Sequence, residues 1–344
     1  MKKERLITGC EAAVLGALEA GADSMFGYPI TPSTEIMQGF IDAVQKDKTL
    51  KFLQTEDETS AGFAVSGAIL GGSRSFTATA GPGHTLMQDP LSMCENLRIP
   101  FVCIVMQRGG PSTGTVNFSQ QEVNLAAFGG NGDGLRFVYS ASNAEEMYSL
   151  TIKAFSTAWK YQFPAFVLGD GHLSKMKVKT ELIKPLNSVK SFPLLKENKT
   201  PTHIRNCYSS EESFGARLKE NIEAWKLAST KIVEFENYKL AGAKEVIIAH
   251  GSVADAVKDA VDIMRSNGKK IGLFRPITVH PFPGADLRKA LGNKAKAYVV
   301  ESALNQFSRI VKYEASGLKT KILEISKPAE SFTATEIVKR ILIA

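Results

Sequence analysis

The sequence has few cysteines, no long apolar run and no complete metal-binding motif. Its four cysteines lie far apart and include no CxxC pair, so disulfides, zinc and iron–sulfur ligation are poorly supported, and no metal site is expected in this chain. A membrane-spanning helix needs about 18 consecutive apolar residues, and no such run occurs. The basic amino-terminal segment lacks the continuous apolar core of a signal peptide. These absences predict a cytoplasmic protein that does not enter a membrane.

The positive charge of the sequence is not arranged as expected for a nucleic-acid-binding protein. The net charge of the 344 residues is +7, and much of it collects in a polar stretch between Lys175 and Lys199. Nucleic-acid binding would need a basic stripe with interleaved aromatic residues or a recognisable motif, and the sequence contains neither. We interpret the lysine-rich stretch as a solvated linker and expect no nucleic-acid partner.

Strand-like and helix-like segments alternate over the first 170 residues. The expected strands are Ser24–Gly27, Lys51–Gln54, Ser75–Thr79, Phe101–Met106 and Ala165–Leu168. The expected helices are Glu11–Ala20, Glu35–Val44, Glu58–Ile69, His84–Leu97 and Ala144–Tyr161. Strict alternation with buried-looking strands predicts a parallel α/β sheet covered on both faces. In such sheets ligands bind beyond the carboxyl ends of the strands.

The alternation stops and then resumes in the second half of the chain. A polar helical stretch is expected over Ser210–Tyr238. A second α/β unit follows, with expected strands at Glu245–Ala249, Ile271–Arg275 and Ala297–Val300 and expected helices at 251–268, 285–291 and 306–315. We therefore predict a first domain over residues 1–185, a polar connecting segment over 186–240 and a smaller α/β domain over 241–344.

The stretch from Lys51 to Gly72 is the first candidate for a functional site. A short strand ends in an acidic cluster, and a helix rich in glycine and alanine begins at or near Glu58, with Thr55 or Asp57 available as its cap. So many small residues lower the helix propensity, which predicts close packing against another backbone or a flat ligand. A glutamate in the first turn of a helix is also a common structural feature, because the helix dipole favours it.

Three further loops follow expected strands and carry residues typical of ligand sites. In GYPITPSTEI (residues 27–36), Thr31 lies between two prolines, and Ser33 or Thr34 can cap the next helix. In TAGPGHTLMQDP (residues 79–90), two glycines permit a close approach of the backbone to a ligand. His84 of this loop could be a general base, a metal ligand or a plain structural histidine. In QRGGPSTGTVNFSQQE (residues 107–122), Arg108 stands directly at the strand end. We expect the four loops to form one site.

Four segments, in this order and spacing, resemble the α subunit of 2-oxoacid:ferredoxin oxidoreductases, and the 2-oxoglutarate enzymes most closely: GYPITPSTEI, EDETSAGFAVSGA, TATAGPG and QRGGPSTG. The later RPITVHPFP and VVESALNQF are similar to the second domain of the same subunit. The resemblance covers nearly the whole chain. It implies a pyrimidine-binding thiamine diphosphate domain with a parallel sheet, followed by a smaller α/β domain like the carboxyl-terminal domain of transketolase.

The resemblance also implies an activity, cofactors and partners. The family oxidatively decarboxylates a 2-oxoacid with coenzyme A, giving an acyl-CoA and carbon dioxide, and passes the electrons to ferredoxin. A β subunit supplies the diphosphate and Mg²⁺ site of thiamine diphosphate, and γ and ferredoxin-like δ subunits and iron–sulfur clusters are expected in partners. The metal–diphosphate signature is GDG followed by an adjacent asparagine pair. GDG occurs at Gly132–Gly134 and at Gly169–Gly171, but no asparagine pair is present, so we interpret both as turns.

Within the resemblance, three residues match catalytic positions. Glu58 matches the glutamate that hydrogen-bonds to the aminopyrimidine ring, a role that needs a carboxyl able to share a proton near neutral pH. Burial can raise a carboxyl pKa by up to about 3–5 units, and the opposing helix-dipole term is under about 1 kcal/mol. Thr31 matches a hydroxyl that contacts the oxo-acid end of the substrate, and Arg108 matches an arginine that receives a substrate carboxylate in its planar fork. A turn contact and a brace to a carboxylate are their structural alternatives.

Other positions of the same loops match contact residues of the family. Cofactor contacts are implied at Tyr28, Pro29, Ile30, Gly81, Pro82 and Gly83, and substrate contacts at Ser112 and Thr113.

Some alternatives remain open from the sequence. His84 and the segment TVNFSQQEV depart from the family pattern near the expected substrate loop, so pyruvate or a branched-chain or aryl 2-oxoacid is an alternative to 2-oxoglutarate. A binding or assembly subunit without catalysis is a second hypothesis, against which the intact Glu58, Thr31 and Arg108 argue. A non-oxidative thiamine decarboxylase or synthase is a third, but such enzymes usually carry both thiamine domains in one chain.

Overall fold

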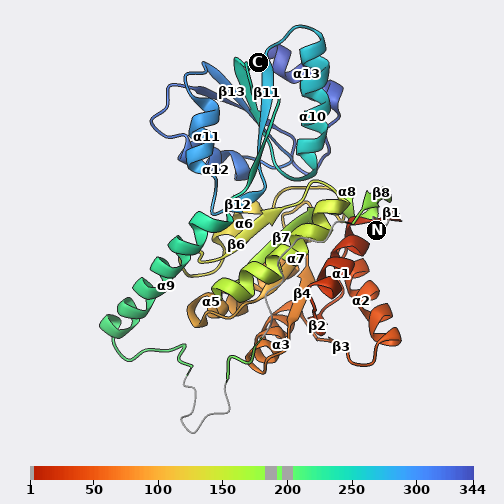
Figure 1. Ribbon diagram of the computed structural model, residues 1–344, viewed down its shortest axis with the longest axis vertical. Coiled ribbons are helices and arrows are strands. Elements are labelled where there is room, and N and C mark those ends of the chain that lie inside the picture. Colours follow the sequence, from red (N-terminus) through yellow and green to blue (C-terminus); the bar gives the residue numbers. More distant parts are fainter. Residues whose placement is uncertain (1–3, 183–191, 196–203) are drawn as a thin grey trace.

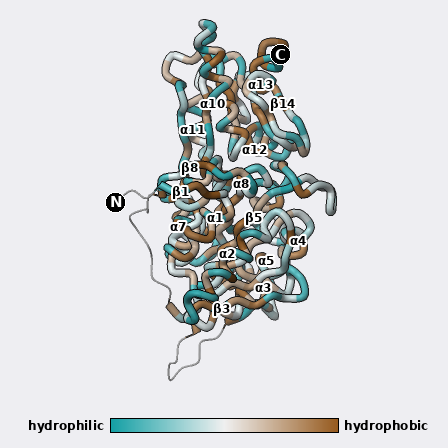
Figure 2. Tube along the Cα trace, turned by 90° about the vertical axis from the view of Figure 1, so that its right-hand side faces the viewer, coloured by the Kyte–Doolittle hydropathy of each residue, from teal (hydrophilic) through white to brown (hydrophobic). Residues whose placement is uncertain are grey.

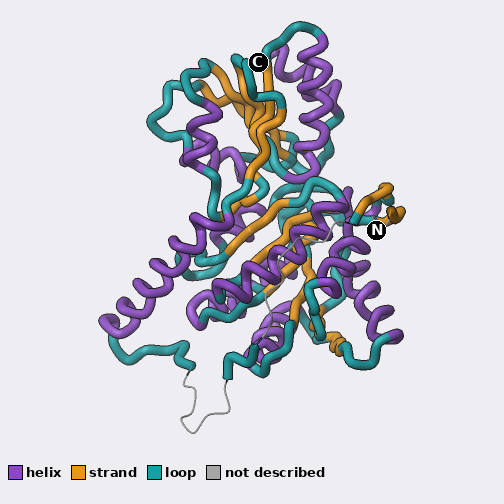
Figure 3. The backbone as a smooth tube through the Cα atoms, in the orientation of Figure 1, coloured by secondary structure: helices purple, strands orange, loops and turns teal. Residues whose placement is uncertain are grey.

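The computed structural model describes residues 4–182, 192–195 and 204–344. Its elements form two α/β units, one above the other in Figure 1, with the amino terminus on the larger unit and the carboxyl terminus on the smaller one. In each unit the strands lie at the centre and helices lie on the outside (Figure 3). Among the described residues, none of the helices is long and apolar enough to span a bilayer.

The larger sheet positions all the loops of the candidate site. Within the described ranges it has seven strands in the order β12–β6–β7–β5–β4–β2–β3, and all neighbours are parallel except β12, which is antiparallel to β6. Because the parallel strands share one direction, the loops that follow them open on the same edge. The strands are β2 Ser24–Gly27, β3 Lys51–Gln54, β4 Ser75–Thr79, β5 Val102–Gln107, β6 Phe137–Ser140, β7 Ala165–Asp170 and β12 Thr278–His280.

Helices cover this sheet, so β4, β5 and β7 are buried along their whole length. Helix α7 lies across the front of the sheet in Figure 1 and packs on α1, while α3 packs on α4 and α5. The helices of this unit are α1 Gly9–Glu19, α2 Thr34–Lys46, α3 Glu58–Leu70, α4 Pro82–Leu86, α5 Gln88–Leu97, α6 Val123–Phe128, α7 Ala144–Tyr161 and α8 Gly171–Lys175.

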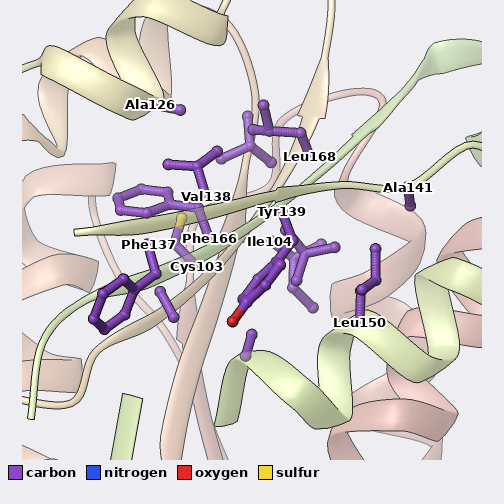
Figure 4. Packing of buried hydrophobic residues seen from close by; sticks show 14 of the residues in the cluster. Cys103, Ile104, Ala126, Phe137, Val138, Tyr139, Ala141, Leu150, Phe166 and Leu168 are labelled. Atoms are coloured by element: carbon purple, nitrogen blue, oxygen red, sulfur yellow. The ribbon is translucent and has the colours of Figure 1, made fainter. Parts of the chain in front are cut away.

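Aromatic and branched side chains fill the core beside β5, β6 and β7 (Figure 4). Phe137, Tyr139 and Phe166 are completely buried, and the Tyr139 hydroxyl is hydrogen-bonded to Thr157 Oγ1 of α7 at 2.8 Å. Burial of one such large apolar side chain stabilises a fold by roughly 1.5–3 kcal/mol. The apolar stretch of β5 lies deep inside the larger unit (Figure 2). The strand ends that carry the loops are therefore anchored in a well-packed core.

The smaller sheet has five strands among the described residues, in the order β14–β13–β10–β11–β9, all parallel except β9. A separate antiparallel pair, β1 with β8, lies beside α1. The remaining elements are β1 Glu4–Ile7, β8 Val178–Glu181, α9 Glu211–Ile232, β9 Phe235–Tyr238, β10 Glu245–Ile248, α10 Gly251–Ser266, β11 Ile271–Pro276, α11 Gly284–Leu291, β13 Lys296–Glu301, α12 Gln306–Glu314, β14 Lys321–Ser326 and α13 Ala334–Ile343.

Most expected elements are present, and the differences lie where a pattern is short or mixed. The helix expected over His84–Leu97 is broken at Met87 into α4 and α5. The helix expected over Ser210–Tyr238 ends at Ile232, and its last four residues form strand β9 instead, because they pair with β11. Strands β6, β8 and β12 were not expected, since each has only three or four residues, and the six-residue strand β14 was missed as well.

Two strands link the regions that the sequence suggested. Strand β12 comes from within residues 241–344 but completes the larger sheet, and β9 comes from within 186–240 but belongs to the smaller sheet. The boundary near residue 185 and part of the lysine-rich stretch lie outside the described residues, so the three regions stay a proposal.

The two units are joined by buried polar contacts. The backbone N–H of Gln120 donates to the Ser302 carbonyl oxygen at 3.0 Å, and the Ser302 N–H donates to Gln120 Oε1 at 3.1 Å. Arg275 of β11 is almost completely buried and forms ion pairs with Glu146 of α7 and Glu236 of β9. The two carboxylate partners offset the free-energy cost of removing the Arg275 guanidinium from water.

Two buried histidines lie at the same junction. His250 Nδ1 is hydrogen-bonded to Ser140 Oγ at 2.9 Å, and His280 Nε2 to the Gly134 carbonyl oxygen at 2.8 Å. Burial lowers the pKa of His250 to about 3 and that of His280 to about 4, from the ordinary value of 6.5. Below pH 6.5 the unfolded chain therefore binds protons that the folded chain does not, so stability falls as the pH drops toward the folded-state values.

We predict that replacing His280 by glutamine removes one of these contributions, so that between pH 7 and pH 5 the free energy of unfolding of His280→Gln falls by roughly 1–2 kcal/mol less than that of wild type. Urea unfolding at several pH values measures the effect. Wild type measured in the same buffers is the reference for the pH slope. Equal pH slopes for wild type and His280→Gln would contradict the prediction.

Candidate functional site

Glu58 opens helix α3 with its side chain turned into the protein, where only 4% of the residue is exposed. Of the two expected caps, Asp57 is the one that forms: its Oδ1 accepts the Ser60 N–H at 2.7 Å. The small residues of α3 pack closely, as predicted, because a Cβ added at Gly62 would lie 2.4 Å from Pro90 Cγ of α5.

The turn after β4 has glycine where Glu58 and Arg108 need space. A Cβ added at Gly83 would lie 2.2 Å from Glu58 Oε1 and 2.6 Å from Thr79 Oγ1. A Cβ at Gly81, which has a φ of +52°, would lie 2.5 Å from Arg108 Nε. The sequence suggested that these glycines admit a ligand, and the structure shows that they first admit two side chains of the site.

Arg108 connects the end of β5 with the loop after β2. The residue is buried, and its Nη1 donates to the Thr31 carbonyl oxygen at 2.7 Å. Its Nε has no hydrogen-bond partner among the described residues. Thr31 therefore meets Arg108 through its backbone and not through its hydroxyl, and the hydrogen-bonding capacity of Nε is not used within the described residues.

Glu122, which the sequence analysis did not single out, holds these elements together. Its Oε1 accepts the Gly81 N–H at 2.9 Å and the Arg108 N–H at 3.0 Å. Its Oε2 lies 3.0 Å from Nδ1 of the completely buried His84. No local pattern identifies such a residue, because its partners come from separate segments of the chain.

Burial raises the pKa of the Glu58 carboxyl, the neighbouring Asp57 raises it further, and Arg108 opposes the shift. The net direction is upward, as the sequence analysis expected. A carboxyl with a raised pKa keeps its proton closer to neutral pH and can share it with a partner.

The structure brings Glu58, Thr31, Arg108 and the glycines together but leaves other predicted residues at the surface. Ser112 and Thr113 are exposed on a loop that is closed by a 2.8 Å hydrogen bond from the Thr115 N–H to the Gly109 carbonyl oxygen. No hydrogen bond within the described part of the chain joins either hydroxyl to the arginine. Three of the implied cofactor contacts are exposed or half-buried on the loop after β2, and one is half-buried in α4: Tyr28, Pro29, Ile30 and Pro82.

Two local expectations are wrong. Ser33 precedes α2 but makes no side-chain cap, because its hydroxyl donates to the Ile30 carbonyl oxygen at 2.8 Å. The GDG at residues 169–171 is a strand end and helix start and not a simple turn: Asp170 Oδ1 accepts the His172 and Leu173 N–H groups of α8.

The segments next to Glu58 expose charged as well as apolar side chains, since Glu56 and Asp57 directly before it are exposed. Four large hydrophobic side chains on β2, β3, α3 and α4 or directly after them are 38–54% exposed: Tyr28, Leu53, Phe63 and Leu86. A groove of about 1040 Å³, lined by Phe128, Trp225 and Tyr313 among others, and a cleft of about 430 Å³ between the two units do not include Glu58. The candidate site therefore lies outside both of these cavities. Within the described ranges no three His, Cys, Asp or Glu side chains are placed to hold a metal ion.

Comparisons with known proteins agree on a family. Residues 15–234 match the model described as pyruvate flavodoxin/ferredoxin oxidoreductase, thiamine diphosphate-binding, and residues 243–326 match pyruvate:ferredoxin oxidoreductase core domain II. The chain is 32% identical to ketoisovalerate oxidoreductase subunit VorB of Methanothermobacter marburgensis, covering 92% of this chain and 90% of that protein. It is 34% identical to 2-oxoglutarate synthase subunit KorA of Methanocaldococcus jannaschii, covering 87% and 88%.

Solved structures give the same answer. The chain is similar to 2-oxoglutarate:ferredoxin oxidoreductase from Magnetococcus marinus, solved with 2-oxoglutarate, coenzyme A and succinyl-CoA bound, with a TM-score of 0.89 and 26% identity. The similarity covers 99% of this chain but only 65% of that longer chain. A split-gene transketolase shares the fold alone, with a TM-score of 0.62 and 11% identity over 98% of this chain and 96% of that chain.

We predict that Gly83→Ala lowers the free energy of unfolding by roughly 1–3 kcal/mol, because the added methyl group forces the Glu58 carboxyl to move. Gly67→Ala in α3 is the matched control. A Cβ there meets nothing within 4 Å, so it should leave stability unchanged or raise it by up to about 1 kcal/mol. Urea unfolding of the two variants decides, and a Gly83→Ala variant as stable as Gly67→Ala would contradict the packing argument.

Proposed function

The chain belongs to the α subunits of the 2-oxoacid:ferredoxin oxidoreductase family, and from this premise we propose that it carries the cofactor-activating half of such an enzyme. The reaction converts a 2-oxoacid, coenzyme A and oxidised ferredoxin to an acyl-CoA, carbon dioxide and reduced ferredoxin. The observation that carries the proposal is the buried Glu58, whose pKa is raised by burial. It lies at the carboxyl ends of the strands, where Arg108 and Thr31 also meet.

The residues present fit the pyrimidine half of thiamine diphosphate. Glu58 makes no side-chain hydrogen bond to another described residue, and the buried Thr79 Oγ1 beside it has no partner there. A buried polar atom without a partner calls for an explanation such as a bound group. When bound, the cofactor supplies a carbon nucleophile for the 2-oxo carbon and an electron sink for decarboxylation. Glu58 would hold a proton against the aminopyrimidine ring, and Tyr28, Pro29 and Ile30 would border it.

Arg108 is suited to receive the 2-oxoacid carboxylate. One edge of its guanidinium is fixed by the Thr31 carbonyl oxygen, and its buried Nε lacks an acceptor among the described residues. A carboxylate that accepts from this group would form a charge-assisted hydrogen bond with defined geometry. The Thr31 hydroxyl is available beside it, since the contact to Arg108 uses the backbone carbonyl.

We propose 2-oxoglutarate as the preferred substrate, on the resemblance of the four site loops to the 2-oxoglutarate enzymes. Branched-chain 2-oxoacids are the alternative, because relatives named for ketoisovalerate and for 2-oxoglutarate are equally similar to this chain. A second carboxylate must be paired if it is buried. His84 is buried against Glu122, so the hydroxyls of Ser112, Thr113 and Thr115 or a partner subunit would have to pair it.

The proposal includes partner subunits. A β subunit would bring the diphosphate and Mg²⁺ site, and γ and ferredoxin-like δ subunits and iron–sulfur clusters would complete electron transfer to ferredoxin. The exposed hydrophobic side chains of β3, α3 and α4, Leu53, Phe63 and Leu86, support a partner subunit, because exposed apolar surface on a folded protein often marks an interface. The cytoplasmic location expected from the sequence is part of the same proposal.

We predict that Glu58→Gln lowers 2-oxoacid-dependent ferredoxin reduction by the assembled complex at least about a hundredfold, because the amide cannot share a proton. Proton exchange at C2 of thiamine diphosphate is the direct measurement. Glu56→Gln changes an exposed carboxyl of the same turn and should keep wild-type exchange. Exchange at the wild-type rate in Glu58→Gln would rule out the assigned role.

For substrate choice, we predict a higher kcat/KM of the complete complex for 2-oxoglutarate than for pyruvate or a branched-chain 2-oxoacid. Arg108→Lys should lower it at least about tenfold, because lysine lacks the planar fork. Arg98→Lys is the control. Arg98 also donates to backbone carbonyl oxygens, those of Tyr161 and Gln162, but it precedes β5, whereas Arg108 follows that strand. A higher kcat/KM for pyruvate or the branched acid would show that the substrate assignment is wrong.

A further inference from the structure

Glu122 is a buried carboxylate for which the proposed reaction has no direct use. It is only 4% exposed, yet it accepts the backbone N–H groups of Gly81 and Arg108 and faces His84. Gly81 in turn lies directly against the Arg108 side chain, where a Cβ would come within 2.5 Å of Nε. One side chain therefore sets both the backbone from which Arg108 projects and the turn against which its guanidinium rests.

The position of Glu122 is itself set by the smaller unit. Gln306 of α12 donates through Nε2 to the Gln121 carbonyl oxygen at 2.6 Å. Gln121 Oε1 accepts the Gly110 N–H at 3.1 Å. Next to it, the backbone of Gln120 is bound to Ser302. The segment that carries Glu122 is thus held between the substrate loop on one side and the smaller unit on the other.

We propose that Glu122 is a positioning residue that fixes Arg108 for the substrate carboxylate, an inference that rests on the function proposed above. It does not touch the substrate. It acts through two backbone hydrogen bonds to a charged acceptor, which are stronger than hydrogen bonds between neutral groups. No hydrogen bond within the described residues joins Glu122 to Glu58, whereas two join it to the backbone of Gly81 and Arg108. We therefore assign its effect to the substrate carboxylate rather than to the activation of the cofactor.

The variant Glu122→Gln tests whether Glu122 affects substrate binding without affecting activation of the cofactor. The amide keeps the shape but removes the charge and replaces one acceptor oxygen with a donor. The KM of the complete complex for its 2-oxoacid should rise about tenfold or more, the size expected when a hydrogen bond to a charged group is lost. The KM for coenzyme A and the rate of C2 proton exchange of bound thiamine diphosphate should stay within about twofold of wild type.

Glu95→Gln is the matched control. Glu95 of α5 is equally buried, accepts the Leu135 N–H at 2.9 Å and pairs with Arg136, but no hydrogen bond joins it directly to Glu122, Gly81 or Arg108 within the described residues. Its loss should lower thermal stability without changing the KM for the 2-oxoacid. A double variant with Arg108→Lys tests the route: if Glu122 acts through Arg108, the combined rise in KM is smaller than the product of the two single effects.

The possible results distinguish a failure of this inference from a failure of the proposed function. A KM for the 2-oxoacid in Glu122→Gln that equals that of Glu95→Gln, a parallel loss of C2 exchange, or fully multiplicative effects with Arg108→Lys would overturn the inference while the proposed function stands. A wild-type complex that oxidises no 2-oxoacid would instead overturn the proposed function. If Glu122→Gln does not assemble, Gln306→Ala removes the anchor of Gln121 without touching the carboxylate. The same KM criterion then applies to that variant.

Discussion

The candidate site depends on one steric constraint: a carboxyl group can be buried at the start of a helix only if the adjoining turn leaves it room. Gly83 leaves that room for Glu58, and Gly81 does the same for Arg108. The packing of α3 on α5, which a Cβ at Gly62 would prevent, brings the helix close enough for the carboxyl to turn inward. The raised pKa of Glu58, its protection from water and its position beside Arg108 all follow from this lack of side chains.

Two carboxylates on the same edge of the sheet differ in what surrounds them. Glu122 meets two backbone N–H groups and His84, so its acceptor capacity is largely used within the protein. Glu58 makes no side-chain hydrogen bond to another residue that the structure describes, although it is equally buried. Buried polar groups are normally satisfied. Glu122 therefore holds parts of the protein together, whereas the Glu58 carboxyl is not engaged by other described residues, as its proposed contact with the cofactor requires.

Sequence reasoning identified the elements whose pattern is local and missed those whose pairing is distant. Strands β2, β3 and β4 were predicted with their observed limits, because each is a short β-rich run bounded by turn residues. Strand β9 was taken for the end of a helix, since only its pairing with β11 defines it. In the site, Glu58 and Arg108 stand directly at strand ends or helix starts and could be predicted. Glu122 could not, because its three partners are separated from it by up to 41 positions in the chain.

Strand β12 has a consequence for how the chain is made. The larger sheet has β6 next to its edge, and β6 is covered only when residues 278–280 add to it. During synthesis the first 170 residues leave the ribosome long before that strand does, so the nascent sheet presents an unpaired edge while the smaller unit is still being translated. Exposed strand edges are templates for pairing with other chains. Until translation passes residue 280, β6 therefore has no strand partner on that side, a condition that favours pairing with other chains.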